Sequence, residues 1–371
     1  MHLLKNLIHT AINVPGFHTN RKLVVIESDD WGSIRMPSSN ALNVLVSKGI
    51  RVDNLAFNKY DSLASESDLK ALFGILGSVH DKNGNPAIIT ANTIMTNPDF
   101  DKIKESNFSE YHYELFTETL KRYPEHAGSF ELWKQGIAEG VFKPQFHGRE
   151  HINVERWMKA LRANSGNVRL AFDLGMYDLS EGRGIIPDSF MDTLNYESEV
   201  ELGRQIDSIR EGLDLFEKVF KYRSATFIAP CYIWDSRIND ALYNGGVRAL
   251  QGGWFQLSPR AGAEHLFKKV FHYTGQYNAL RQVYFVRNAS FEPSVDNPSF
   301  IKEQLLSKME FLFRMKRPVI ISSHRLNFIG YVNQQNRERN LEIFAELLIQ
   351  ITKRWPEIEF ISSDQLLEIM S

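Results

Sequence analysis

The chain contains 371 residues, of which 43% are hydrophobic, and carries a formal net charge of −2 at pH 7. A chain of this size can bury a large core, and nothing in its near-neutral charge indicates nucleic acid or an anionic membrane surface as the main partner. Its single cysteine, Cys231, excludes an intramolecular disulfide and a thiolate zinc cluster. Histidine, aspartate and glutamate must therefore supply the ligands of any metal ion.

The sequence contains no apolar stretch long enough to span a membrane. Residues 1–10 lack a long apolar core and a small-residue cleavage site, so we interpret them as an amphipathic helix rather than a signal peptide. We accordingly expect a cytoplasmic protein. No pattern in the sequence indicates its oligomeric state.

Short aliphatic, β-branched or aromatic runs alternate along the chain with segments of helical periodicity. We predict strands at Leu23–Ser28, Ala87–Ala91, Lys143–Phe146, Ala225–Ala229, Val247–Leu250, Gln282–Val286, Val319–Ser322 and Ile358–Ile361. The main helical patterns lie at Glu199–Phe220, Phe300–Arg314 and Arg337–Arg354. This alternation predicts an α/β fold of parallel βαβ units, and seven or eight such units favour a barrel over an open sheet. We expect one domain, 1–371, with insertions near 51–67 and 177–195.

Two adjacent carboxylates, Asp29 and Asp30, follow the first apolar run. The carboxyl ends of parallel strands are where α/β folds place their chemistry. Like charges this close need a cation, a proton or separate hydrogen-bonded environments. A turn or a helix cap is the structural alternative for this pair, because aspartate is favoured in both.

A second polar motif, His147-Gly148-Arg149-Glu150-His151, follows the strand predicted at Lys143–Phe146. Histidines at i and i+4 share one face if the segment is helical, and two imidazoles can then hold one metal ion. An aspartate from a neighbouring strand end would complete a set of two histidines and one carboxylate, which leaves coordination positions for water and substrate. Chance surface placement is the alternative.

Two further strand ends carry candidate groups. His324 follows the apolar run Val319–Ile321, where it could act as a general acid or simply cap the next helix. Pro230, Cys231 and Tyr232 follow the strand predicted at Ala225–Ala229. A plain turn is the structural interpretation of the latter.

The ordered series of motifs resembles the polysaccharide deacetylase superfamily, the NodB-homology group of carbohydrate esterase family 4. The matching positions, spread over residues 29 to 324, are Asp29-Asp30, His147–His151, Ala229-Pro230-Cys231-Tyr232 and Ser323-His324. Each motif is short, so the resemblance depends on the set and its order. It implies a distorted (β/α) barrel, usually with seven strands.

The resemblance also implies the roles of these residues. Asp30, His147 and His151 would bind a divalent metal ion, commonly Zn²⁺ and sometimes Co²⁺ or Ni²⁺. Asp29 would be the general base and His324 the general acid, as general acid–base chemistry at a metal-bound water requires. Residues expected to contact the carbohydrate substrate are Pro230, Cys231, Tyr232, Trp254 and Arg149.

The sequence departs from the family where an arginine usually positions the base, because Ile228 occupies that place. Arg149 and Arg325 are the candidates to replace it. The function expected is removal of an acetyl group from an N-acetylated or O-acetylated carbohydrate, in surface-glycan or sugar-precursor metabolism. The alternatives are a related metal hydrolase, a glycoside hydrolase that pairs Asp29 with Glu292 or Asp364, and a non-catalytic carbohydrate-binding relative.

Overall fold

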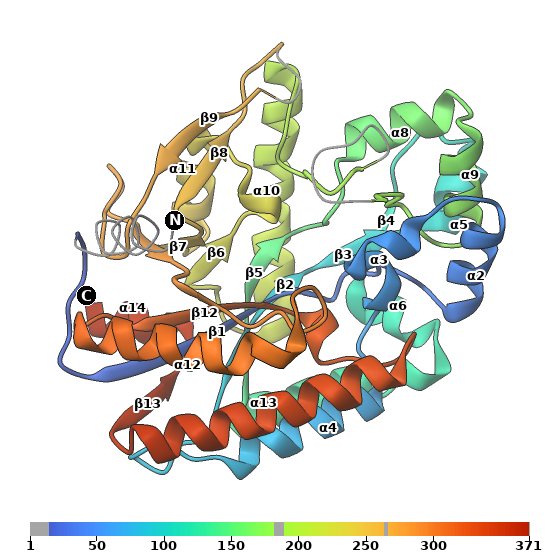
Figure 1. The fold of residues 1–371 in the computed structure, drawn as a ribbon. Coiled ribbons are helices and arrows are strands. Elements are labelled where there is room, and N and C mark those ends of the chain that lie inside the picture. The colour runs from blue at the N-terminus through green and yellow to red at the C-terminus, as the bar shows by residue number, and fades with distance from the viewer. Residues whose placement is uncertain (1–14, 182–188, 263–265, 371) are drawn as a thin grey trace, which may run out of the picture.

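The computed structural model describes residues 15–181, 189–262 and 266–370. Its centre is a nine-stranded sheet in which every pairing between strands is parallel (Figure 1). The strands are β1 (Lys22–Trp31), β2 (Ile89–Ile94), β5 (Phe142–Gly148), β6 (Thr226–Ile228), β7 (Ala249–Gly252), β10 (Val283–Val286), β11 (Ala289–Ser290), β12 (Val319–His324) and β13 (Ile358–Ile361). The eight strands predicted from the sequence are all present.

The sheet closes into a ring. Its strands follow the order β10-β7-β6-β5-β2-β1-β12-β11, and the two strands at the ends of this order are separated in the chain only by Arg287 and Asn288. β13 pairs with Lys22–Val25 of β1, on the side where β2 pairs with the second half of that strand. With β10 and β11 counted as one interrupted strand, seven strands form the ring, which confirms the expected distorted barrel.

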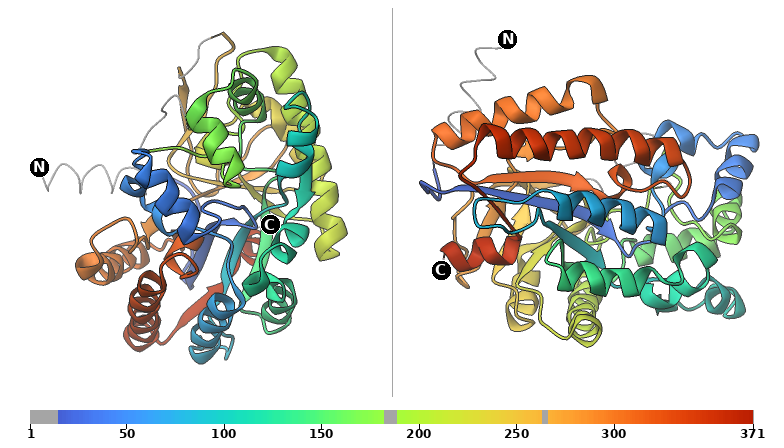
Figure 2. Two further views of the ribbon diagram at one scale, coloured as in Figure 1. Left: turned by 90° about the vertical axis from the view of Figure 1, so that its right-hand side faces the viewer. Right: turned by 90° about the horizontal axis from the view of Figure 1, so that it is seen from below.

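Helices surround the strands (Figure 2). The long ones are α4 (Glu66–Ser78), α7 (Ser129–Ala138), α10 (Glu199–Phe220), α12 (Pro298–Arg314) and α13 (Gln334–Arg354), with α14 (Ser363–Met370) at the C-terminus. Shorter helices are α2 (Ser39–Ser47), α3 (Ala56–Tyr60), α5 (Phe100–Glu105), α6 (Phe116–Lys121), α8 (Val154–Arg162), α9 (Gly166–Asp173) and α11 (Asn239–Asn244). Two antiparallel pairs complete the fold: β3 (Thr96–Pro98) with β4 (Tyr113–Leu115), and β8 (Phe255–Ser258) with β9 (Lys268–Phe271).

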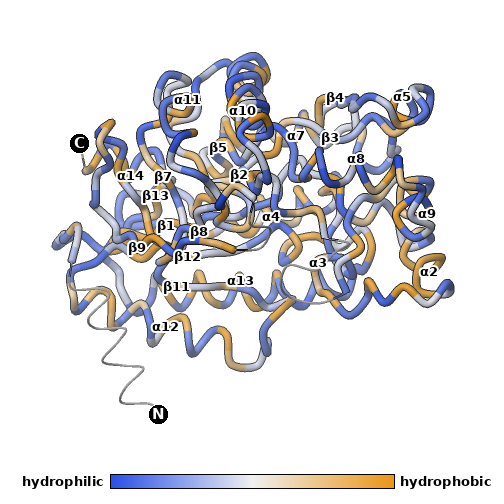
Figure 3. Tube along the Cα trace, turned by 90° about the horizontal axis from the view of Figure 1, so that it is seen from above, coloured by the Kyte–Doolittle hydropathy of each residue, from blue (hydrophilic) through white to orange (hydrophobic). Residues whose placement is uncertain are grey.

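Helix α10 illustrates why these segments are helical. Ser198 caps its N-terminus by accepting a hydrogen bond from the Glu201 N–H, and acidic residues in the first turn complement the helix dipole. The helix ends at Lys221, which adopts a left-handed conformation with φ of 66°. Both hydrophobic and hydrophilic residues occur along the helix (Figure 3), and the helix packs against β5 of the sheet.

Strand β1 is buried on both faces, and its alternation organises the core. Val24 and Ile26 belong to the large apolar cluster beneath the helices. Leu23 and Val25 point the other way, into a smaller cluster with residues of β7, β10, β12, β13 and α14. Because side chains alternate along a strand, Glu27 and Asp29 continue this inner face. The barrel interior therefore changes from apolar to charged toward the carboxyl ends of its strands.

Two expectations concern the chain termini and membranes. The amphipathic helix expected at residues 1–10 lies outside the described residues. In the part of the chain that the structure describes, no helix combines the length and apolarity that a membrane crossing needs.

Candidate metal centre and active site

The end of β1 is irregular, and the irregularity brings both aspartates to one cavity. The pairing of β1 with β2 shifts register between Ser28 and Trp31, and Asp30 has φ of 71°. A regular strand would point adjacent side chains to opposite faces, whereas a bulge re-aims one of them. Asp29 and Asp30 consequently line the same cavity, whose volume is about 260 Å³.

The histidine motif reaches this cavity from β5. His147 is still in the strand, and the chain then turns at Gly148, whose φ of 136° suits glycine. His151 follows in the loop before α8, so the expectation of a helical i,i+4 pair is wrong. A strand end followed by a tight turn brings the two imidazoles together instead, with ring centroids 5.2 Å apart.

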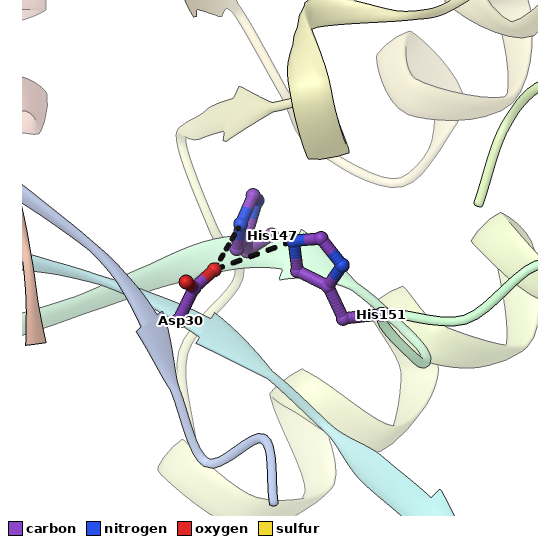
Figure 4. A group of neighbouring side chains, drawn as sticks. All are labelled: Asp30, His147 and His151. Carbon is purple, nitrogen blue, oxygen red and sulfur yellow. Dashed lines mark ion pairs between the residues drawn. The ribbon is translucent and has the colours of Figure 1, made fainter. Parts of the chain in front are cut away.

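Both imidazoles point at the Asp30 carboxylate (Figure 4). Asp30 Oδ1 lies 3.4 Å from His147 Nε2 and 3.3 Å from His151 Nε2, and one ligand atom of each residue lies within 4.8 Å of the others. Ligands about 2.0–2.1 Å from a tetrahedral metal ion are separated by about 3.3 Å. The three side chains therefore already have the spacing of a metal ligand set.

Hydrogen bonding prepares His147 for this role. Its Nδ1 lies 2.9 Å from the backbone oxygen of Ile228, so Nδ1 carries the proton and Nε2 has a free lone pair. That Nε2 atom is buried and has no hydrogen-bond partner among the described residues. A buried, unpartnered imidazole nitrogen next to a carboxylate fits a divalent cation.

Asp29 has a different partner. Arg287, between β10 and β11, donates two hydrogen bonds of 2.6 Å to its two carboxylate oxygens, and Asn92 donates a third of 2.8 Å. Burial alone would raise the pKa of Asp29, but the charge and hydrogen bonds of Arg287 lower this pKa to about 2. Asp29 is therefore a carboxylate that stays ionised at neutral pH.

Arg287 supplies the cation that Ile228 does not, and the sequence reasoning missed it. The replacements suggested from the sequence are wrong, because Arg149 pairs with Glu150 and Glu211. Arg325 pairs with Asp61. Arg149 also does not line the cavity.

A signal for Arg287 was nevertheless present in β1. Glu27 interrupts an apolar strand and shares the inner face with Asp29, and Arg287 Nε donates to Glu27 Oε2 over 2.7 Å. Two buried carboxylates on one face require a cation. The alternation therefore predicts an arginine or lysine partner without saying which one.

His324 lies beside Asp29. Its backbone pairs with that of Asp29 in the β1–β12 register, and its Nε2 is 3.7 Å from Asp29 Oδ2. Its Nδ1 lies 2.6 Å from Glu292 Oε1, and Asn327 donates to the other oxygen of Glu292. Burial would lower the pKa of His324, but Glu292 raises it to about 9, so His324 carries a proton at neutral pH.

The segment after β6 forms another wall of the cavity. Cys231 and Tyr232 line it and have left-handed φ values of 55° and 57°, while Pro230 forms the turn between them and the strand. Such values are unusual outside glycine and are found at functional sites. The Tyr232 N–H donates to the Ala229 oxygen, whereas the Cys231 N–H has no acceptor among the described residues.

Trp254 does not line this cavity. It lies in a neighbouring cavity of about 1060 Å³ beside α12, and Tyr232 lines both. The two segments expected to be insertions line the first cavity, through Leu55 and Phe57 and through Ser180, Ser189 and Met191. These segments shape the cavity above the barrel.

The fold and the site together define a parallel (β/α) barrel with three histidines and three carboxylates gathered at the carboxyl ends of its strands. No model of a known protein family matches the sequence, and no curated protein matches it.

Solved structures similar to the chain include one assigned as a polysaccharide deacetylase from Mycobacterium smegmatis, with 10% identity, coverage of 96% of this chain and 92% of that chain, and a TM-score of 0.47. A second, from Pseudomonas aeruginosa PAO1 and similarly assigned, has 8% identity, coverage of 93% and 90%, and a TM-score of 0.47. A CE4 family pseudoenzyme from Bacillus anthracis has 10% identity, coverage of 90% and 63%, and a TM-score of 0.33. These assignments name the family that the motifs resemble, but TM-scores below 0.5 leave the functional argument to the site itself.

Proposed function

We propose that this protein is a metal-dependent hydrolase that removes an acetyl group from an N-acetylated or O-acetylated carbohydrate, in surface-glycan or sugar-precursor metabolism. The convergence of Asp30, His147 and His151 in one cavity carries the proposal. Two histidines and one carboxylate leave coordination positions for water and substrate. Zn²⁺ is the proposed ion, with Co²⁺ and Ni²⁺ as alternatives.

The other side chains have the properties that hydrolysis of an acetamide needs. A divalent ion at this site would supply Lewis-acid polarisation and a more acidic water. Asp29, kept ionised by Arg287, is placed to accept the proton of the attacking water. The Cys231 N–H is available to the carbonyl oxygen as negative charge develops on it. His324, kept protonated by Glu292, can donate its proton to the leaving nitrogen.

The test combines metal content with acetate release. Elemental analysis should find about one divalent ion per wild-type chain, and an N-acetylated sugar should release acetate. Asp30→Ala and His147→Ala should lose both, because each removes a ligand. His112→Ala is the control, since His112 is partly exposed and does not line the cavity. Unchanged acetate release by the Asp30→Ala variant would contradict the proposal.

Zinc should also stabilise the folded protein. An ion that binds only the native state adds about 2.7 kcal/mol when its concentration is 100 times its Kd. Its addition should raise the Tm of the wild type and leave that of Asp30→Ala unchanged. Equal increases in both would place the bound ion elsewhere.

The pairing of Asp29 with Asp364 and the non-catalytic interpretation lose their particular support, while the pairing of Asp29 with Glu292 stays an alternative. Asp364 pairs with Lys143, at the opposite end of β5 from His147, and cannot form a glycosidase pair with Asp29 across the cavity. The non-catalytic interpretation depended on a missing arginine, and Arg287 occupies that role. A reducing-sugar assay in parallel with the acetate assay separates glycoside hydrolysis from deacetylation.

A further inference from the structure

Arg35 is a buried cation in the cavity wall that the proposed reaction does not use. It is 6% exposed and lines the same cavity as Asp29 and Asp30. Its Nε donates to Asn58 Oδ1 and its Nη2 to Asp178 Oδ2, each over 2.9 Å. The third nitrogen, Nη1, donates to none of the described residues, and unlike a buried unpartnered atom it is not fully shielded from solvent. We take Nη1 to face the open cavity.

The other two buried arginines near the site are fully engaged. Arg287 uses all three nitrogens on Glu27, Asp29 and weaker hydroxyl contacts. Arg325 uses two nitrogens on Asp61 and the third on the Ser33 backbone oxygen. Both arginines therefore complete internal ion pairs, whereas Arg35 keeps donor capacity on the cavity side.

The position of Arg35 indicates which part of a substrate it would meet. Its guanidinium lies over the ring of Phe57, 5.4 Å from the centroid, and that ring packs edge-to-face on His324 at 4.9 Å. Phe57 thus connects Arg35 and His324 along one wall. Because His324 is the proposed donor to the leaving amine, its contact with Phe57 places Arg35 on the wall where the sugar that carries this amine would bind.

The surroundings hold Arg35 in place before any ligand arrives. Asn58 comes from the first insertion and Asp178 from the second, and Ser180 donates to the other oxygen of Asp178. A side chain ordered in advance loses little conformational entropy on binding. A guanidinium fixed in this way matches the planar oxygens of carboxylate and phosphate groups.

We propose that Arg35 binds a negatively charged substituent, a carboxylate or a phosphate, on the sugar that leaves with the amine. This inference rests on the proposed function and adds the charge of the substrate to it. Asp178 balances the charge of Arg35 in the free protein, so recognition depends on the free Nη1 donors rather than on net charge.

The test compares matched substrates that differ only in charge. We would measure kcat/KM for acetate release from N-acetylglucosamine, from its 6-phosphate and from its 6-carboxylate. The wild type should prefer one or both charged sugars, and which one it prefers identifies the anion. Arg35→Gln should lower kcat/KM for that sugar by about tenfold to a hundredfold, the range of one charge-assisted hydrogen bond, and change the neutral sugar little.

Two further variants keep the test decisive. Arg337→Gln is the matched control, since Arg337 pairs with Asp68 and does not line the cavity, and it should affect all three sugars alike. Arg35→Lys keeps the charge beside Asp178 but lacks Nη1, so it should lower the preference even if Arg35→Gln fails to fold. A wild type without preference, or an Arg35→Lys that keeps the wild-type preference, would overturn the inference.

Binding without turnover separates this inference from the proposed function. Isothermal titration would compare glucosamine, its 6-phosphate and its 6-carboxylate. If no sugar releases acetate but a charged one binds tightly only when Arg35 is present, the proposed function fails and the inference stands. If the neutral sugar is deacetylated and Arg35→Lys leaves the affinity for all three sugars unchanged, the proposed function stands and the inference fails.

Discussion

Arg287 should be the most sensitive position of the charged interior, and Arg287→Gln tests this. The substitution leaves Glu27 and Asp29, which are 0% and 5% exposed, without the cation that both share. Removing one partner of a buried ion pair costs about 3–5 kcal/mol. With an unfolding entropy of about 2.1 cal/mol/K per residue, this corresponds to a drop in Tm of about 4–6 °C. Urea denaturation followed by circular dichroism would measure the change in the free energy of unfolding, and thermal unfolding would measure the change in Tm.

A control variant and a double-mutant cycle test this prediction. Arg204→Gln breaks an exposed pair with Glu155 and should cost less than about 1 kcal/mol. Adding Glu27→Gln to Arg287→Gln should recover stability, because it removes one of the two unpaired buried charges, with a coupling of about 0.5–3 kcal/mol. The reasoning would be refuted if Arg287→Gln lowered the free energy of unfolding no more than Arg204→Gln does. It would also be refuted if the effects of Arg287→Gln and Glu27→Gln on this free energy simply added.

Three other predictions concern His324 and two glycines of helix α10. The pKa of His324 is raised to about 9, so acetate release should persist at neutral pH and fall as the pH rises through 9. Glu292→Gln should move this fall to lower pH in a pH–rate profile, because it removes the carboxylate that raises the pKa. A profile that does not move would contradict this prediction. On helix α10, Gly203→Ala meets no atom within 4 Å and should stabilise the protein by about 0.5–1 kcal/mol. Gly212→Ala places its Cβ 2.8 Å from Cζ of the buried Phe146 ring, so thermal unfolding should show a loss instead.

Much of the fold was predictable because the signals are local. The apolar runs of the barrel strands are continuous, as expected of strands buried on both faces, and β13 was predicted at its observed bounds, Ile358–Ile361. The pairing order was not predictable, because strand neighbours depend on contacts between distant segments. Seven strands in the ring came from the family resemblance rather than from periodicity.

The candidate site was predictable in its residues but less so in its geometry. Asp30, His147 and His151 were expected to converge, and their ligand atoms do. The backbone geometry that brings them together differs from the one expected, since a bulge in β1 and a turn after β5 replace the helical spacing considered for the histidines. Bulges and turns leave weak traces in one sequence. Arg287 was missed because Glu27 and Asp29 indicate only that a cation is needed, and a partner 258 positions away from Asp29 leaves no local pattern of its own.

The ring of strands closes at the two residues between β10 and β11, and Arg287 is one of them. Asp29, the proposed base, thus receives its cation only when the first strand and the segment between β10 and β11 meet. Closure of the barrel and the pairing of Asp29 with Arg287 therefore depend on the same segment. If the proposed function holds, a molecule whose ring has not closed would lack an ionised base, so incomplete folding should produce inactive protein rather than a weak or promiscuous hydrolase.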